Sequence, residues 1–166
     1  MTITFRALTA ALVLMVLSPL AAFAQGAQVA FGGIRADTSL PVEVTADQLM
    51  VNQTDGTATF SGNVLVAQGE MRLSAAEVLV EYGTEDRSRI ERLHATGGVT
   101  LVSGADAAEA AEAVYTIDSG DVVMTGNVLL TQGANTITGQ MLTVDLKTGT
   151  GRMEGRVKTV LQPGGN

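Results

Sequence analysis

Short apolar runs alternate with clusters of glycine, asparagine and aspartate along most of this 166-residue chain. Each run is rich in Val, Leu, Ile and Thr, the residue types that favour β-strands. Turn-forming pairs such as Asp55-Gly56 and Ser119-Gly120 separate several of the runs. The pattern predicts an all-β fold of short strands over these runs: Val42–Val44, Leu49–Val51, Val64–Ala67, Val78–Tyr82, Val99–Val102, Val114–Ile117, Val128–Thr131, Met141–Leu146 and Val157–Leu161.

Small residues recur between the runs at a regular spacing. The successive gaps are 16, 13, 22, 13, 16, 13 and 16 residues. One gap of 16 and one of 13 make a unit of 29 residues, which recurs about four times. The long gap falls around Glu81–Arg89, where a charged stretch predicts an exposed turn. Such a period predicts stacked repeats that bury their apolar faces against one another. The positions are Ala46, Gly62, Ala75, Gly97, Ala110, Gly126, Gly139 and Gly155.

Two segments are also similar in sequence. Residues 58–82 align with residues 122–146 without a gap. The alignment pairs Gly62-Asn63-Val64-Leu65 with the same four residue types at 126–129, and Gln68-Gly69 with Gln132-Gly133. We interpret both Gln-Gly pairs as turns.

The stretch Ala105–Ala113 has high helix propensity when it is taken alone. It nevertheless fills the same 13-residue interval as two neighbouring units, and Ala111-Glu112-Ala113-Val114 matches Ala76-Glu77-Val78-Leu79. Because the repeat register outweighs local propensity, we predict a weak strand, with a helical turn as the alternative.

The interior of the fold is less well determined. Several runs are apolar at consecutive positions, which suits a strand covered on both faces or a strand with one face lining a ligand groove. A plain dry core is the third interpretation. The residues alone leave all three open.

The chain divides into four parts. Residues 1–24 carry one basic residue, an apolar run and a small-x-small site at Ala22-Phe23-Ala24, which predicts an exported protein cleaved after Ala24. A retained membrane anchor is the alternative, although the apolar run is short of the roughly 20 residues that span a bilayer. Residues 25–39 are expected to form a flexible leader, 40–163 the β-domain and 164–166 a disordered tail.

Composition excludes several classes of function. Removal of the predicted signal peptide, residues 1–24, takes away Arg6 and leaves 9 basic and 17 acidic side chains. The resulting net charge of −8 argues against nucleic-acid binding. The chain holds no Cys, so a disulfide framework is excluded.

Catalytic and metal-binding constellations also fail. His94 is the single histidine, and the spacing of Ser103, Ser119 and Asp118 does not support a triad with it. We therefore predict no enzyme, no cofactor and no metal site.

One acidic pattern follows the repeat. Asp47, Glu77 and Glu112 each come one residue or two after a small-residue position. A carboxylate row for cations is one interpretation. The favoured one is that these acidic residues keep exposed strands soluble and unpaired.

Several short motifs, in order, resemble the LptA/OstA family. They are Pro41–Asp47, Phe60–Gly69, Ala75–Glu77, Ala110–Tyr115, Met124–Val128 and Thr159–Pro163. Proteins of this family carry lipopolysaccharide through the periplasm. The resemblance implies an open β-jellyroll of about sixteen short antiparallel strands, with a groove for acyl chains and open ends that pair edge to edge with relatives.

The resemblance also implies roles for individual residues. Val42, Val44, Leu101, Tyr115 and Ile117 match positions that line the lipid groove. Ordinary core packing is the alternative for all five. The final strand, with Val157, Thr159 and Leu161, is expected to offer its free edge to a partner.

The predicted function is a periplasmic bridge that relays lipopolysaccharide from an inner-membrane complex to an outer-membrane translocon. Its expected partners are lipopolysaccharide, an inner-membrane LptC-like protein, an outer-membrane LptD-like protein and further copies of itself, head to tail. Two alternatives remain: a membrane-anchored LptC-like component of the same pathway, and a structural β-solenoid module with a dry core.

Overall fold

The computed structural model describes residues 27–30, 34–84 and 88–162. Within these ranges every regular element is a strand, and thirteen strands pair antiparallel in one continuous sheet. This confirms the predicted all-β fold class. The strands are β1 (Ala27–Ala30), β2 (Glu43–Thr45), β3 (Gln48–Asn52), β4 (Thr57–Gln68), β5 (Met71–Tyr82), β6 (Ile90–Thr96), β7 (Val99–Ser103), β8 (Asp106–Ala110), β9 (Glu112–Thr116), β10 (Asp121–Gln132), β11 (Asn135–Asp145), β12 (Thr150–Glu154) and β13 (Lys158–Val160).

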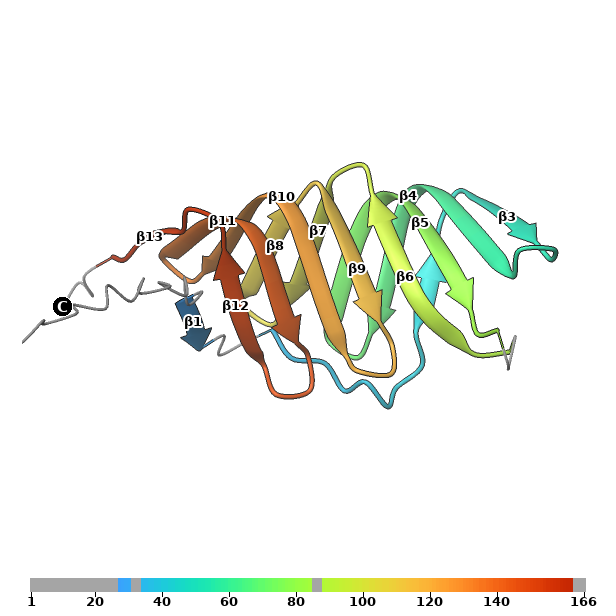
Figure 1. The fold of residues 1–166 in the computed structure, drawn as a ribbon, viewed down its shortest axis with the longest axis horizontal. Helices are drawn as coiled ribbons and strands as arrows, with labels where there is room; N and C mark the ends of the chain where they lie inside the picture. Colours follow the sequence, from blue (N-terminus) through green and yellow to red (C-terminus); the bar gives the residue numbers. More distant parts are fainter. Residues whose placement is uncertain (1–26, 31–33, 85–87, 163–166) are drawn as a thin grey trace, which may run out of the picture.

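The sheet folds over on itself into two layers, which gives the elongated jellyroll of Figure 1. Layer one has the strand order β3-β4-β5-β6-β9-β10-β11-β12-β1. Layer two has the order β2-β4-β5-β7-β8-β10-β11-β13. The four long strands β4, β5, β10 and β11 belong to both layers, so they join the layers along one margin, which we call the corner.

The resemblance implies about sixteen short strands, whereas the described residues form thirteen, four of which are long and bend from one layer into the other. β4, β5 and β10 have 12 residues and β11 has 11. The register shifts between Ser61 and Val64 in β4, and between Thr125 and Val128 in β10. Such a β-bulge bends a strand without ending it. The small residues at these two places therefore mark bends within strands.

The corner of β4 and of β10 uses the same pair of residues. Gly62 and Asn63 have φ values of 79° and 46°, and Gly126 and Asn127 have φ values of 88° and 49°. This left-handed backbone favours glycine and asparagine. A Cβ on Gly126 would also lie 2.7 Å from the Cβ of Ala111. Backbone conformation and close packing together explain the repeated Gly-Asn.

Backbone hydrogen bonds connect the corner from one strand to the next. The N–H of Asp47 donates to the carbonyl of Gly62 at 2.9 Å. Farther along, the N–H of Gly98 donates to the carbonyl of Ala111 at 3.2 Å, and the N–H of Ala111 donates to Gly126 at 3.0 Å. These bonds join neighbouring elements at the corner through their backbones.

The stretch Ala105–Ala113 is extended, as predicted. It forms β8 and the beginning of β9, and β8 pairs with β7 and β10. Its alternating burial places Ala108 and Ala113 in the interior. Tertiary pairing therefore overrides the helix propensity of this segment.

The core lies between the two layers. Inward-facing apolar side chains from nearly every long strand form one cluster, and none of them is more than 9% exposed. The largest fully buried ones are Tyr115, Ile34, Met71, Leu101, Met124, Leu130, Leu142, Leu146 and Met153. The layers therefore enclose one apolar interior that runs along the molecule.

The segment before residue 40 differs from the flexible leader that we expected. Ala27–Ala30 form β1, which pairs with β12 and covers its outer edge. Ile34 is fully buried, and residues 35–40 make hydrogen bonds to both layers. These contacts join distant parts of the chain, so no local pattern reveals them. The predicted signal peptide 1–24 and tail 164–166 lie outside the described residues.

Candidate functional site

The margin opposite the corner, which we call the mouth, is where hairpin turns of the two layers face each other. Layer two contributes the turns at 69–70, 104–105 and 133–134, and layer one contributes those at 117–120 and 146–149. No strand passes from one layer to the other here in the described part of the chain. The mouth is therefore the side on which the interior is not closed by a β-ladder.

Residues 34–41, which we call the strap, run along the mouth from the β12 end of the molecule to β2 (Figure 1). On layer one, the N–H of Ala36 donates to the carbonyl of Leu146 at 3.2 Å. The guanidinium of Arg35 donates to the carbonyl of Thr148 through Nε at 3.1 Å and Nη2 at 2.7 Å. On layer two, the hydroxyl of Ser103 donates to the carbonyl of Arg35 at 2.6 Å. The strap thus ties the two layers together.

A buried polar network lies beneath the strap. The hydroxyl of Tyr115 in layer one donates to Oε1 of Gln68 in layer two at 2.6 Å. Nε2 of Gln68 donates to the carbonyls of Thr38 at 3.2 Å and Leu40 at 2.8 Å. Both network side chains are 1% exposed. Burial raises the pKa of the Tyr115 hydroxyl, and the hydrogen bond to Gln68 opposes this rise in part.

A pocket of about 520 Å³ opens at the mouth beside the strap. Val42, Ile90 and Ile117 form its apolar surface, and Gln68 lies on its wall. The strap residues Thr38, Ser39 and Leu40 complete that wall. The pocket is therefore an opening between the layers whose width depends on the strap.

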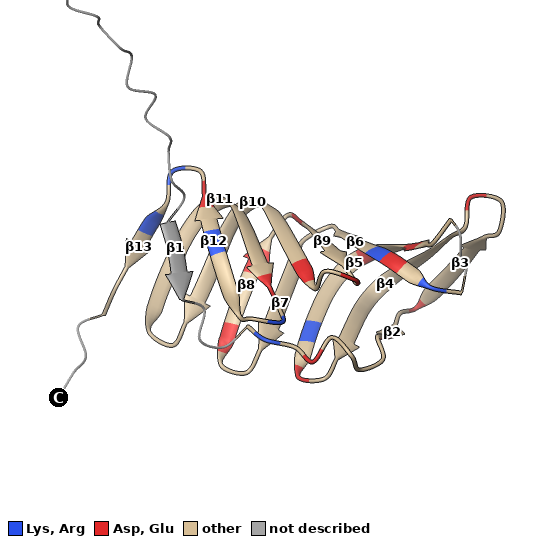
Figure 2. Cartoon of the chain, turned by 60° about the horizontal axis from the view of Figure 1, so that its bottom comes forward, with Lys and Arg blue, Asp and Glu red and all other residues tan. Residues whose placement is uncertain are grey.

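Charged side chains stand on the rim of this pocket. Arg89 forms an ion pair with Asp118, and Lys147 Nζ donates to the carbonyl of Asp118 at 2.6 Å. Both members of the ion pair are largely exposed, so it adds little to stability. In the view of Figure 2 the Lys and Arg residues of the described chain are scattered singly over the sheet.

The structure brings some of the predicted groove residues together. Val42 and Ile117 line the mouth pocket from opposite layers. Tyr115 reaches the same pocket through Gln68, although its own side chain is buried. Leu101 is fully buried in the core, and Val44 is half-buried against it. The five residues therefore belong to one apolar interior, but two of them alone face its opening.

Sequence reasoning missed the polar side chains at the mouth. Gln68 and Gln132 come directly before hairpin turns, which is why we interpreted them as turn residues. Gln68 holds the strap, whereas Nε2 of Gln132 donates to Oδ2 of Asp106 at 2.9 Å. The repeated Gln-Gly pair was the available signal, because a turn alone does not require glutamine.

The recurring acidic residues do not gather into one site. Oδ2 of Asp47 accepts a hydrogen bond from Asn63 at 2.8 Å. Oε2 of Glu112 lies 3.4 Å from Nε2 of His94, and Glu77 lies in the ladder of β5 and β6. The described residues contain no group of three or more His, Cys, Asp or Glu side chains that could hold a metal ion.

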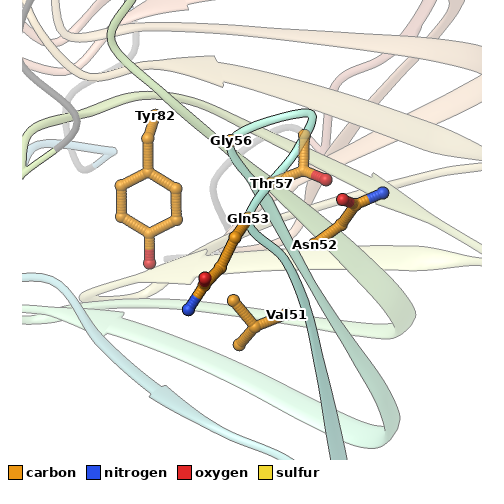
Figure 3. Close-up of a pocket in the computed structure, with 6 residues that line it drawn as sticks. All are labelled: Val51, Asn52, Gln53, Gly56, Thr57 and Tyr82. Atoms are coloured by element: carbon orange, nitrogen blue, oxygen red, sulfur yellow. The ribbon is translucent and has the colours of Figure 1, made fainter.

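The two ends of the sheet expose different edges. At one end, β3 presents Leu49, Met50 and Val51, which are 56%, 74% and 59% exposed. A pocket of about 370 Å³ lies beside it, and in Figure 3 the side chain of Gln53 lies between those of Tyr82 and Val51 on the lining of this pocket. β3 and β2 each pair only with β4 within the described chain.

At the other end, β13 pairs with β11, and no described strand covers its outer edge. Of the three predicted edge residues, Thr159 lies in β13 opposite Ile137, and Val157 and Leu161 flank the strand. Leu161 is 69% exposed. The neighbouring edge of β12 is instead covered by β1.

Among the described residues, the structure holds no helix of the length and apolarity needed to cross a membrane.

Comparison with known proteins gives consistent matches. The family model described as LptA/(LptD N-terminal domain) LPS transport protein matches residues 43–150. An uncharacterised protein of Rhizobium meliloti (strain 1021) is 29% identical over 153 residues, which cover 86% of this chain and 82% of the relative. Lipopolysaccharide export system protein LptA of Haemophilus influenzae is 26% identical over 140 residues, or 78% of this chain and 81% of that protein.

A solved structure has the same fold. It is the crystal structure of LptH from Pseudomonas aeruginosa, described as the LptA homologous periplasmic component of the lipopolysaccharide transport device. The TM-score is 0.68 at 20% sequence identity, and the match covers 77% of this chain and 99% of LptH.

Proposed function

This chain belongs to the LptA/(LptD N-terminal domain) LPS transport protein family, and from that premise we propose that it relays lipopolysaccharide across the periplasm through the space between its layers. Members of this family are transport proteins, not enzymes. The observation that carries the proposal is a single apolar interior whose long side margin is held by a strap and side-chain hydrogen bonds instead of a ladder.

An acyl chain gains from such an interior. Transfer of each buried CH₂ from water is favourable by about 0.8 kcal/mol. The interior is packed with the protein's own side chains, so a bound chain must part the two layers. The mouth is the margin where this separation breaks the fewest backbone hydrogen bonds, and Val42 and Ile117 stand at its opening. Val44, Leu101 and Tyr115 would contact a chain that lies deeper.

The ends of the sheet suit edge-to-edge pairing. Unpaired strand edges expose backbone N–H and C=O groups, which bind a further strand readily. We assign β2 and β3 as one docking end and β13, with Val157, Thr159 and Leu161, as the other. The partners in this proposal are an LptC-like protein, an LptD-like protein and further copies of this chain. Head-to-tail contacts of this kind do not close and so build filaments.

A substitution experiment tests the groove. Val44→Glu and Ile117→Glu each place a charged side chain against the apolar interior, which is costly. We expect both variants to lose binding of purified lipopolysaccharide while their β-structure, measured by circular dichroism, is retained. Val102→Glu is the matched control, because Val102 lies in a strand of layer two but is exposed. Equal binding by all three variants would contradict the groove.

A truncation tests the docking end. Removal of the chain from Val157 onward deletes β13 and uncovers one edge of β11. We expect a monomer that still binds lipid and no longer forms head-to-tail oligomers in sedimentation experiments. Oligomers as stable as those of the full chain would show that association uses another surface.

One alternative function has an observation in its favour. The close packing of the interior also suits a structural β-module with a dry core. In that case Val44→Glu and Ile117→Glu would unfold the protein, and no lipid would copurify with the wild type. The same two variants therefore separate the alternatives.

Export completes the proposal. We propose that the chain is periplasmic and is cleaved after Ala24. Mass analysis of the exported protein should find Gln25 as its first residue. A membrane-bound product that retains Met1 would favour the LptC-like alternative.

A further inference from the structure

The strap crosses the mouth without becoming part of either layer. Residues 34–41 form no strand, and their hydrogen bonds to the layers lie at separated points instead of forming a ladder. Ile34 anchors one end in the core. At the other end, the carbonyls of Thr38 and Leu40 accept both hydrogen bonds of the Gln68 amide.

The amide of Gln68 has a fixed orientation. Its Oε1 accepts the hydrogen bond of the Tyr115 hydroxyl, so Nε2 must face the strap. A flipped amide would turn Oε1 toward two carbonyl oxygens, which cannot donate. Gln68 therefore presents two N–H donors, 1% exposed, to whatever occupies the mouth.

The two carbonyls that accept hydrogen bonds from Gln68 are chemically similar to a group found in acyl lipids. A peptide carbonyl has the same hydrogen-bonding chemistry as the amide or ester carbonyl that joins an acyl chain to its headgroup. The mouth pocket of about 520 Å³ brings Gln68 and the apolar residues Val42 and Ile117 together. A carbonyl on Gln68 would thus leave its acyl chain beside apolar surface.

Resting on the proposed lipid-carrier function, we propose that the strap is a displaceable lid, and that the ester or amide carbonyl of an acyl lipid replaces the carbonyls of Thr38 and Leu40 on Gln68. The Gln68 donors need such a replacement, because buried N–H groups that lost the strap carbonyls without a new acceptor would remain unsatisfied. The strap therefore closes the mouth when lipid is absent and moves aside when lipid loads.

Hydrogen exchange tests the displacement. The N–H of Ala36 is bonded to Leu146 only while the strap is closed. The probe is lysophosphatidylcholine with one ester-linked tetradecanoyl chain, below its micelle-forming concentration. At saturation we expect the Ala36 amide to exchange faster and the core amides of Leu101 and Tyr115 to exchange more slowly.

A paired substitution tests the role of the strap in loading. Arg35→Ala removes two hydrogen bonds to the Thr148 carbonyl at an exposed position. We expect it to speed probe binding by about threefold to tenfold, because the closed strap is held less tightly. Arg72→Ala is the control: it has the same change of charge, and its hydrogen bonds go to Gly69 and Met71 in a hairpin. It should bind at the wild-type rate.

A second pair tests the carbonyl exchange itself. The wild type should bind the ester-linked probe about threefold to tenfold more tightly than the ether-linked tetradecyl analogue, which lacks the carbonyl. Gln68→Met should remove this preference. Gln132→Met should keep it, because the amide of Gln132 bonds to Asp106 instead of the strap.

The outcomes separate the lid from the carrier function. Failure of the wild type to bind either probe overturns both. Tight binding with unchanged exchange at Ala36, and with equal rates for Arg35→Ala and Arg72→Ala, overturns the lid alone. An ester-to-ether preference that survives in a folded Gln68→Met variant overturns the carbonyl exchange.

Discussion

The two long margins of this jellyroll are closed in different ways. At the corner, four strands run through both layers, and backbone hydrogen bonds such as those from Asp47 to Gly62 and from Ala111 to Gly126 join neighbouring elements. At the mouth, the layers are joined by the strap and by side chains such as Gln68 and Tyr115. The corner therefore fixes how the layers are connected, whereas the mouth is the margin that can open. We therefore expect the corner to contribute more to stability and the mouth to control access of a ligand.

The largest effect is expected at the corner. Gly126→Ala must place a Cβ 2.7 Å from that of Ala111 at a φ of +88°. Backbone strain and overpacking together should lower the free energy of unfolding by about 2–5 kcal/mol. Urea denaturation measures the loss.

A matched glycine separates the two contributions. Gly98 has a φ of +87°, but nothing lies within 4 Å of the position that a Cβ would take there. Gly98→Ala should therefore show only the strain, about 1–3 kcal/mol. Equal losses at Gly98 and Gly126 would mean that close packing at the corner is unimportant.

A smaller effect is expected where the two layers meet at the mouth. Tyr115→Phe removes the donor to Oε1 of Gln68 and leaves a buried acceptor unsatisfied. We expect a loss of about 1–3 kcal/mol in the free energy of unfolding. Tyr82→Phe removes the same atom from a ring that is only half-buried, where water can hydrogen-bond to the groups around it, so the loss should be smaller. If Tyr115→Phe left the free energy of unfolding unchanged, the buried polar network would not contribute to stability.

How far the sequence predicts the molecule follows the same division. The corner can be predicted from local sequence, because the left-handed backbone of the Gly-Asn pairs favours these residue types and their spacing shows where the strands bend. In sequence a β-bulge and a strand break look alike, and at the Gly-Asn pairs of β4 and β10 the structure has a bulge within one strand. Pairing between distant strands decides which one forms.

The mouth could be predicted only in part. Val42 and Ile117 were identified from a family resemblance, and both line the opening. The strap has no period, and its bonds to Thr148 and Ser103 span 113 and 68 residues of sequence, so nothing local marks them. Gln68 was hidden by its place before a turn. Contacts between side chains and distant backbone groups leave no regular pattern to read.

A weaker contact at the mouth should give a correspondingly modest change. Ser103→Ala removes one hydrogen bond from a buried hydroxyl to the carbonyl of Arg35. We expect about 1 kcal/mol less stability, together with faster proteolysis within the strap. Ser74→Ala, at an exposed position of the same layer, is the control and should change neither. Unchanged proteolysis of Ser103→Ala would show that this bond does not hold the strap.

The smallest effect is expected from pH. The side chain and backbone N–H of Ser39 lower the pKa of Asp37 below its usual 3.8. The side chain and backbone of Thr148 do the same for the pKa of Asp145. Because both pKa values are lower in the folded state, the stabilisation is complete above pH 3.8 and is lost as the pH falls through the folded values. Both carboxylates shape turns that carry the strap or its Thr148 anchor.

Acidification below pH 3.8 should therefore loosen the strap before the corner. Thermal melts and Ala36 exchange, compared between pH 5 and pH 2.5, measure the change. Many carboxylates titrate in this range, so the informative quantity is the difference from an Asp37→Asn, Asp145→Asn double variant. An asparagine oxygen still accepts the turn hydrogen bonds but does not titrate. The double variant should show a smaller pH dependence than the wild type. Identical pH dependence would show that these two carboxylates do not help to hold the strap over the mouth.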